Sequence, residues 1–588
     1  MSTIDHWRDH WQQRAVQHPF ARLVLHFLAR LVRGGHETES ADFDFGAGPL
    51  LGLLAAPGAF CSLVLFEKYS TLQDFILQRR HPNVDAMSAP DKYFFICLAM
   101  AVAGVVTAIK WDKILPDSQD YLNLAPLPLR PRTILLANAA AIAIAVVVFA
   151  VDVNGASTVL FPTIVTAYSH QGPGAIALFA AAHAVSVTLA CLFAFCSIFA
   201  LLGALAVVLP REAFRACSSW VRGGALLASV MLLFTSATGP ALLRGLAKSP
   251  DSAARFLPPL WYFGLYQTLQ GRPTPLILQL AHTALWAFAA AFVLMVAAYA
   301  LTYRRSFAGV LENGRSPSQQ RILATVLAFL DLFSRRAGGF DRACHRFIIR
   351  AMLRSEPHRM CIGVAAGLGW LLALQQMSAQ SETSQLAAPL TAAYLLILGL
   401  RIAFEIPAGV AANWVFRATL DPRAHQSNHH SSIPALGAPS RVMLSFLVPL
   451  VLAPAFALAW LQWNFRVAVI HTLYVLALSL CLSAVLLAGY RKIPLTCPMP
   501  GFRDNLLALC VIQIVGFSLF SQLGARLELR MLSHPWNFLL VPLAMAGAWF
   551  WNRRRIADAR EAGELEESLT FENIQAPVVE RLDLFDAR

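Results

Sequence analysis

Three histidines, His425, His429 and His430, are the residues whose types and spacing best suit metal binding. On a helix, His425 and His429 would share one face, where two imidazole nitrogens could hold a metal ion. The surrounding stretch, RAHQSNHHSSIPALGAP, is rich in polar residues, glycine and proline, as flexible loops are. We expect a solvated loop here, with a metal site as the alternative.

Known catalytic signatures are absent from the sequence. It contains no G-x-x-x-x-G-K-[ST] loop for nucleotide phosphates, and neither G-x-S-x-G nor H-E-x-x-H. The ten cysteines include no C-x-x-C pair, so no zinc site is indicated. We expect the chain not to be an enzyme and to bind no cofactor or metal of its own.

Ionisable side chains inside membrane-spanning helices mark ion and proton pathways. Few ionisable residues lie inside the apolar runs of this sequence. Asp152, Arg401 and Glu405 are at predicted span ends, and His183, His282 and His471 are isolated. We expect each of these histidines to be a hydrogen-bonded packing residue. Their scarcity argues against a proton- or sodium-driven transporter, which binds its ion through buried carboxylates or broken helices.

The composition of the whole chain is that of an integral membrane protein. Of its 588 residues, 57% are hydrophobic and 14% are charged, whereas soluble domains have roughly 25% charged residues. Because a span needs about 20 mainly apolar residues, we expect an all-α polytopic membrane protein with about twelve transmembrane helices. The predicted spans are 48–66, 93–109, 134–153, 175–209, 223–243, 276–303, 358–375, 386–404, 442–461, 468–489, 505–524 and 536–552. The run at 175–209 is too long for a straight span and could include an interfacial turn.

The placement of arginine predicts the orientation of these spans. The net charge is +13, and the arginines gather at the ends of apolar runs, which is the positive-inside pattern and not a nucleic-acid groove. We expect both termini in the cytoplasm and the loops 67–92 and 244–275 outside. Aromatic residues of the 244–275 loop could line a substrate exit or cap the bundle; they are Phe256, Trp261, Tyr262, Phe263 and Tyr266.

The chain also has the pattern of two unequal copies of one plan. Each copy starts with a basic amphipathic stretch, at 19–33 and at 340–354, which we expect to lie in the membrane interface. The predicted parts are an interfacial N-terminus (1–47), a first six-helix half (48–303), a cytoplasmic linker with an interfacial helix (304–357), a second six-helix half (358–552) and an acidic cytoplasmic tail (553–588).

Each half then has a structured cytoplasmic segment after its second span. In Lys110–Arg132, Asp117 can cap a short helix, and prolines end it before the next span. In Arg401–Arg423, Pro407 can begin a helix with apolar contact residues. We expect two cytoplasmic docking helices that contact a partner; the alternative is a capped connector without one.

Short motifs in and near these segments carry a resemblance to a known family. They are Trp111-Asp112-Lys113, Asp117-x-x-Asp120-Tyr121-Leu122, Leu124-x-Pro126-Leu127-Pro128-Leu129, Leu257-Pro258-Pro259-x-Trp261, Ala403-Phe404-Glu405-Ile406-Pro407, Ala412-Asn413-Trp414-Val415-Phe416-Arg417 and Lys492-Ile493-Pro494-Leu495-Thr496-Cys497. Together with the arrangement of spans, they resemble the membrane subunit of a bacterial ABC exporter of the type-2 permease class. The chain departs from a simple member in its doubled length and in the asymmetry of its halves.

This resemblance implies a multi-pass permease of the bacterial inner membrane whose two six-span halves, fused in one chain, form one translocation pathway. A separate cytoplasmic ABC ATPase, binding ATP and Mg, would dock on the two coupling helices and drive export of a substrate. The sequence does not identify this substrate; a lipid, a peptide or a drug would each suit an apolar pathway. The implied contact residues are Asp117, Asp120, Tyr121, Leu124, Glu405, Asn413 and Trp414. Alternatives are an ion-coupled secondary transporter, favoured by buried acids or broken helices, and a polytopic membrane enzyme, favoured by an acidic or histidine cluster.

Overall fold

The computed structural model describes the chain in segments, and every regular element in these segments is a helix. The described residues are 19–33, 47–77, 84–114, 124, 130–168, 172–236, 239–248, 253–307, 327–335, 339–378, 381–406, 408, 437–487, 494–495, 513, 515–539, 541–543, 545–547, 550 and 554. Within them, nine helices are long and apolar enough to cross a membrane. The chain is therefore an all-α membrane protein that crosses the bilayer several times, as its composition predicts.

Residue contacts divide the chain into two compact units. The described residues up to 307 belong to the first unit, and those from 327 onward belong to the second. The boundary falls inside the segment 304–357, which the sequence predicts to be a linker. Each unit has its own hydrophobic core.

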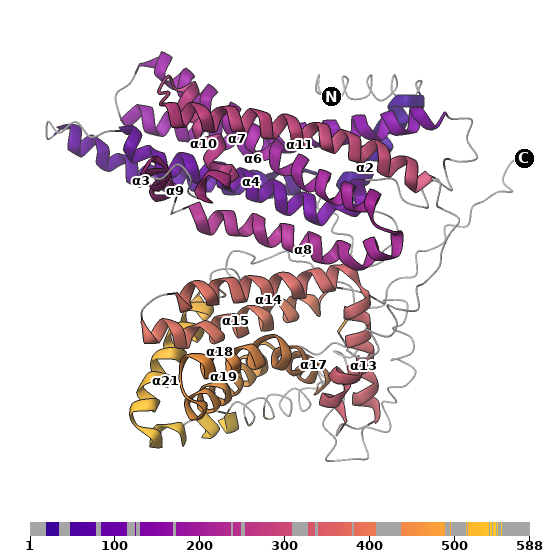
Figure 1. Cartoon of the computed structure of the whole chain (residues 1–588), viewed down its shortest axis with the longest axis vertical. Helices are drawn as coiled ribbons and strands as arrows, with labels where there is room; N and C mark the ends of the chain where they lie inside the picture. The colour runs from indigo at the N-terminus through magenta and orange to yellow at the C-terminus, as the bar shows by residue number, and fades with distance from the viewer. Residues whose placement is uncertain are drawn as a thin grey trace, which may run out of the picture. The chain divides into compact units, whose positions relative to one another are not determined.

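The first unit is built around helix α7. Its helices are α2 (Pro19–Arg33), α3 (Ala47–Leu77), α4 (Val84–Ile114), α6 (Pro131–Tyr168), α7 (Pro173–Val208), α8 (Arg211–Thr235), α9 (Gly239–Lys248), the 3-10 helix η2 (Ala253–Phe256), α10 (Pro258–Leu269) and α11 (Pro275–Phe307). Helix α7 packs against α4, α6, α10 and α11 (Figure 1). It is apolar around its circumference, as expected of a helix with neighbours on several sides.

Two predicted spans differ from the helices observed. The run at 175–209 forms one continuous helix, α7, with no interfacial turn, because no proline interrupts its hydrogen bonds after Pro173. The predicted span 223–243 is shifted: α8 ends at Thr235, and α9 begins separately at Gly239, where Pro240 follows. Both differences arise because hydropathy does not record where the helical hydrogen bonds stop.

The two predicted external loops are mostly helical. Helices α3 and α4 leave only 78–83 between them, so the predicted loop 67–92 is largely part of these helices. In the 244–275 segment, α10 packs against α4, α7 and α11. Tyr262, Phe263 and Tyr266 are buried there, whereas Phe256 is 66% exposed. Most of these aromatic residues therefore belong to the core of the unit instead of lining its surface.

Helix α2 confirms the first predicted amphipathic helix. It begins at Pro19, whose fixed φ and missing N–H suit the first helical position. Leu23 and Phe27 are buried against Ile134 and Ala137 of α6. The apolar stripe predicted from the sequence therefore attaches α2 to the start of α6.

The second unit is built around helix α15, because 78% of the residues in its most apolar stretch are buried. The helices of this unit are the 3-10 helix η3 (Asp331–Ser334), α13 (Gly339–Arg354), α14 (Glu356–Met377), α15 (Glu382–Ala403), α17 (Gly437–Leu447), the π-helix η6 (Val448–Leu452), α18 (Ala453–Gln462), α19 (Phe465–Leu486), the π-helix η7 (Leu519–Leu523), α21 (Gly524–Ser533) and the 3-10 helix η8 (Pro535–Leu539). Helix α15 packs against α14, α19 and α21. Helix α13 confirms the second predicted amphipathic helix.

Glycines allow α14 and α15 to approach each other closely. A methyl group added at Gly399 would lie 2.2 Å from Cβ of Ala365, and one added at Gly369 would lie 3.0 Å from Cα of Ala392. Small residues at such contacts let the backbones of membrane helices come together. The α14–α15 pair therefore depends on these two positions.

Gly399→Ala is expected to destabilise the second unit by about 1–3 kcal/mol, because overpacking this contact pushes the two helices apart. The measurement is thermal unfolding of the full chain in detergent, followed by tryptophan fluorescence. Gly155→Ala in α6 is the matched control, since a methyl group there would meet no atom within 4 Å. Equal melting temperatures for the two variants would contradict a close α14–α15 contact.

Candidate functional site

The structure describes one of the four predicted contact residues of the first cytoplasmic segment. Leu124 is helical and partly buried, and it packs on the cluster that joins α2 to α6. Asp117, Asp120 and Tyr121 lie outside the described residues. Leu124 therefore packs against a cluster formed by α2 and α6 of its own chain, which sequence reasoning did not anticipate.

In the second cytoplasmic segment, Glu405 is described and has a partner within its own unit. Its carboxylate accepts a hydrogen bond from the guanidinium of Arg401, one turn earlier. The backbone N–H of Ala408 donates to the carbonyl of Leu495 at 3.0 Å, and the N–H of Leu495 donates to the carbonyl of Phe404 at 3.3 Å. The chain leaving α15 is thus held in place. Asn413, Trp414 and the histidines at 425, 429 and 430 lie outside the described residues.

The first unit contains a buried group of polar side chains that the sequence analysis did not predict. We call it the Lys92 cluster. Its members come from α3, α4, α6, α7 and the end of α10, and they are Lys68, Tyr69, Asp91, Lys92, Ser157, His183, Tyr266 and Gln270. Adjacent residues point about 100° apart on a helix, so Asp91 and Lys92 contact different neighbours.

Asp91 pairs with residues of α3. Its Oδ2 lies 2.6 Å from Nζ of Lys68 and accepts a hydrogen bond of 2.5 Å from the hydroxyl of Tyr69. The carboxylate is buried, whereas the Lys68 side chain is 37% exposed. A buried carboxylate needs such partners, because losing its hydration is costly.

Lys92 faces α7 and α10 and is fully buried. Its Nζ donates to Oε1 of Gln270 at 2.7 Å and lies 5.0 Å and 5.5 Å from the ring centroids of Phe179 and Tyr266. A cation over an aromatic face gains roughly 0.5–2 kcal/mol. Removing an ammonium group from water is costly, and these contacts offset part of that cost.

His183 connects the remaining members of the cluster. Its Nδ1 lies 3.0 Å from the hydroxyl of Tyr266, and its Nε2 lies 3.2 Å from Oγ of Ser157. The rings of Phe95 and Phe161 pack around it. His183 is hydrogen-bonded, as predicted, but it is not isolated, because Tyr266 also contacts Lys92.

A cavity of about 170 Å³ lies beside the Lys92 cluster. Phe179 and Gln270, which both contact Lys92, form part of its lining, together with Ser88, Thr166 and the exposed Arg272. A polar cavity of this size can hold several water molecules. An ion or a small polar group could therefore reach the Gln270 side of the cluster.

The second unit contains a buried His–Glu pair between α19 and α21. Nδ1 of His471 lies 2.7 Å from Oε1 of Glu528, and the two side chains are 1% and 0% exposed. The other oxygen of Glu528, Oε2, has no hydrogen-bond partner among the described residues. Burial raises the pKa of Glu528 above its ordinary value.

These contacts correct the expectation that ionisable residues are scarce in the helical core. One predicted span begins at 93 and another ends at 524, so Asp91, Lys92 and Glu528 fall in predicted loops. In the structure, however, α4 begins at Val84 and α21 continues to Ser533. The buried residues of α21 include Ala525 and Glu528, three apart on one helical face.

Asp152 and His282, which the sequence analysis also singled out, belong to neither the Lys92 cluster nor the His–Glu pair. Asp152 lies in the middle of the helix α6, not at its end, and its Oδ2 is buried with no partner in the described segments. His282 is exposed on α11. Across the described ranges, no three His, Cys, Asp or Glu residues come close enough to hold a metal ion.

No protein family model matches the chain, and no curated protein or solved structure shows significant similarity to it.

Proposed function

We propose that this chain is the membrane subunit of a transporter of the bacterial inner membrane, with cytoplasmic termini and a separate ABC-type ATPase that binds the segments 110–132 and 401–423. One observation carries the proposal. In both units, the basic amphipathic helix packs on the first described long helix after the proposed docking segment: α2 packs on α6, and α13 packs on α17, which continues through η6 into α18.

The order of elements around these contacts is the same in both units. An amphipathic helix is followed by two long helices, then by the cytoplasmic segment and a further long helix. In the second unit, Nε2 of His345 lies 3.0 Å from Oγ of Ser445, and Cys344 and Ile348 are buried in the core. A segment with anchored ends can transmit the movement of a docked partner to the helices, as coupling to an ATPase requires.

The ion-coupled transporter is a second candidate, favoured by the buried ionisable residues. Asp91 and Lys92 lie in the first unit, and His471 and Glu528 lie in the second. Intramembrane ionisable residues mark ion pathways and proton relays. Asp91 and Glu528 are buried carboxylates. Both lie outside the predicted spans, which is why the sequence argues against an ion-coupled transporter.

Asp120→Lys is expected to weaken binding of the ATPase by about tenfold or more, since a reversed charge in a contact costs at least ~1.4 kcal/mol. The measurement is co-elution of the tagged chain with ATPase subunits from its native host, together with ATP hydrolysis. Leu124→Asp is less suitable, because Leu124 also packs against the α2–α6 cluster and its loss would disturb that contact.

Glu382→Lys is the matched control, because Glu382 is exposed at the end of α15 opposite to Glu405. We expect it to leave co-elution unchanged. A wild-type chain that elutes without an ATPase, yet takes up protons in proteoliposomes under a pH gradient, would contradict the ATPase-driven proposal and support the second candidate.

A further inference from the structure

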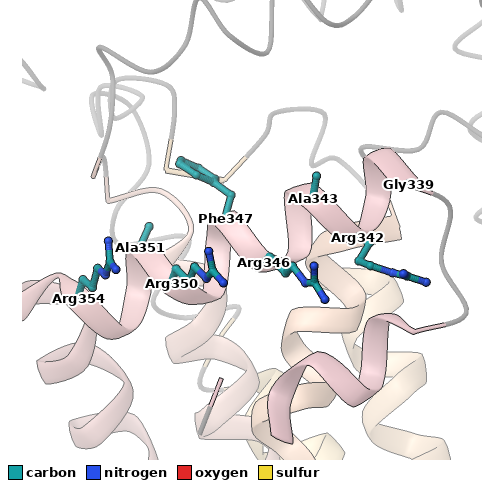
Figure 2. Close-up of a pocket in the computed structure, with 8 residues that line it drawn as sticks. All are labelled: Gly339, Arg342, Ala343, Arg346, Phe347, Arg350, Ala351 and Arg354. Carbon is teal, nitrogen blue, oxygen red and sulfur yellow. The ribbon is translucent and has the colours of Figure 1, made fainter. Parts of the chain in front are cut away.

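Helix α13 has four arginines on one face (Figure 2). Arg342, Arg346, Arg350 and Arg354 are four residues apart, which places them along one side of the helix over about 18 Å. We call this set the arginine face. The opposite side of α13, including Ile348 and Met352, is buried in the hydrophobic core and fixes which way the arginines point.

A groove of about 510 Å³ runs along the arginine face. Its described lining combines the four arginines with small and apolar residues of the same helix, namely Gly339, Ala343, Phe347 and Ala351 (Figure 2). Ligand sites commonly have volumes of about 300–1,000 Å³. The groove therefore offers both positive charge and apolar surface to one occupant.

The first two arginines are fixed by the chain itself. Arg342 donates from Nε to the carbonyl of Ser334 at 3.3 Å, and Arg346 forms a 2.7 Å ion pair with Asp331. Arg350 and Arg354 are exposed, and neither forms a hydrogen bond or an ion pair with any described residue. Among the described residues, only Asp331 offsets the positive charge of the face, which favours an anionic occupant.

The position of α13 in the chain indicates which anion is near. The helix ends at Arg354, and α14, which is long and apolar enough to cross the membrane, begins at Glu356. Arg350 and Arg354 therefore lie at the boundary between water and lipid. Guanidinium groups bind phosphate oxygens in a bidentate manner, and basic residues at this boundary attract anionic lipids.

We propose that the arginine face of α13 binds the phosphate groups of anionic phospholipids at the membrane surface. Arg350 and Arg354 are the principal contacts, while Arg342 and Arg346 are held by Ser334 and Asp331. Phe347 and the alanines of the groove contact the apolar part of the lipid beneath the headgroup. This inference does not depend on the proposed transport function.

The test measures binding of phosphatidylglycerol and phosphatidylcholine to the purified full chain by native mass spectrometry. The wild type is expected to prefer phosphatidylglycerol. Arg350→Gln/Arg354→Gln should weaken that binding about 30-fold, since each surface arginine near an anionic bilayer contributes about 1 kcal/mol. Arg526→Gln/Arg530→Gln on α21 is the matched control, because it removes two exposed arginines at the same spacing.

Four results would overturn the proposal. One is equal binding of the two lipids by the wild type, and another is undiminished phosphatidylglycerol binding by the α13 double variant. The third is full displacement of the lipid by millimolar inorganic phosphate, which would show that the face binds free anions. An equal loss in the α21 control would also count against it, because the effect would then follow net charge and not this face.

Discussion

Lys92→Met is expected to lower the activity of the chain about tenfold or more while leaving the folded protein at least as stable as the wild type. Methionine has a similar length and fills the same space between Phe179 and Tyr266, but it carries no charge. Removing the charge also removes the cost of taking it out of water, which we expect to offset the lost hydrogen bond to Gln270. A buried lysine retained at that cost points to a role other than stability.

Two measurements separate stability from activity in this variant. Thermal unfolding in detergent should give a melting temperature no lower than that of the wild type. ATP hydrolysis by the co-purified complex, or proton uptake into proteoliposomes loaded with a pH-sensitive dye, should fall about tenfold or more in whichever assay the wild type is active. Lys248→Met, at an exposed lysine of α9, is the control and should change neither result.

Either of two outcomes would contradict this role for Lys92. Unchanged activity at an unchanged melting temperature would make the side chain a packing residue. A large drop in melting temperature would show that its hydrogen bond to Gln270 matters more to the fold than the cost of burying its charge.

Glu528→Ala is expected to destabilise the second unit by about 3–5 kcal/mol, because it removes one partner of a buried pair and leaves His471 without the carboxylate. Glu528→Gln should cost much less, since its side-chain oxygen can still accept a hydrogen bond from Nδ1 of His471. Chemical unfolding of the full chain in detergent measures both differences.

A double-mutant cycle isolates the pair. If His471 and Glu528 act together, His471→Ala/Glu528→Ala should destabilise the chain by less than the sum of the two single changes. Glu382→Ala at the exposed start of α15 is a control for removing a carboxylate from the surface. Additive effects of the two single changes would contradict a direct interaction between the side chains.

The amphipathic helices show where sequence reasoning works well. The apolar stripe of α2 is a local property, so the positions of Leu23 and Phe27 on the buried face follow from helical periodicity alone. The same holds for α13, whose arginines recur every four residues. What periodicity does not supply is the partner of each face, here α6 for α2 and α17 for α13.

The boundaries of the long helices were harder to predict. A hydropathy window ends a span at the first charged residues, so it excluded Asp91, Lys92 and Glu528, although the helices continue through all three. Helix formation depends on backbone hydrogen bonds. A buried charged side chain does not interrupt them when another side chain forms a hydrogen bond with it.

The sequence by itself determined the class of this protein: an apolar composition with few charges and long apolar runs requires helices in a membrane, because lipid cannot satisfy an exposed backbone. Only the tertiary structure decided which ionisable residues are buried together. Tyr69 and Asp91 are 22 residues apart, and His471 and Glu528 are 57 apart. Such pairs form when packing brings separate helices into contact, and no local pattern of apolar residues records that approach.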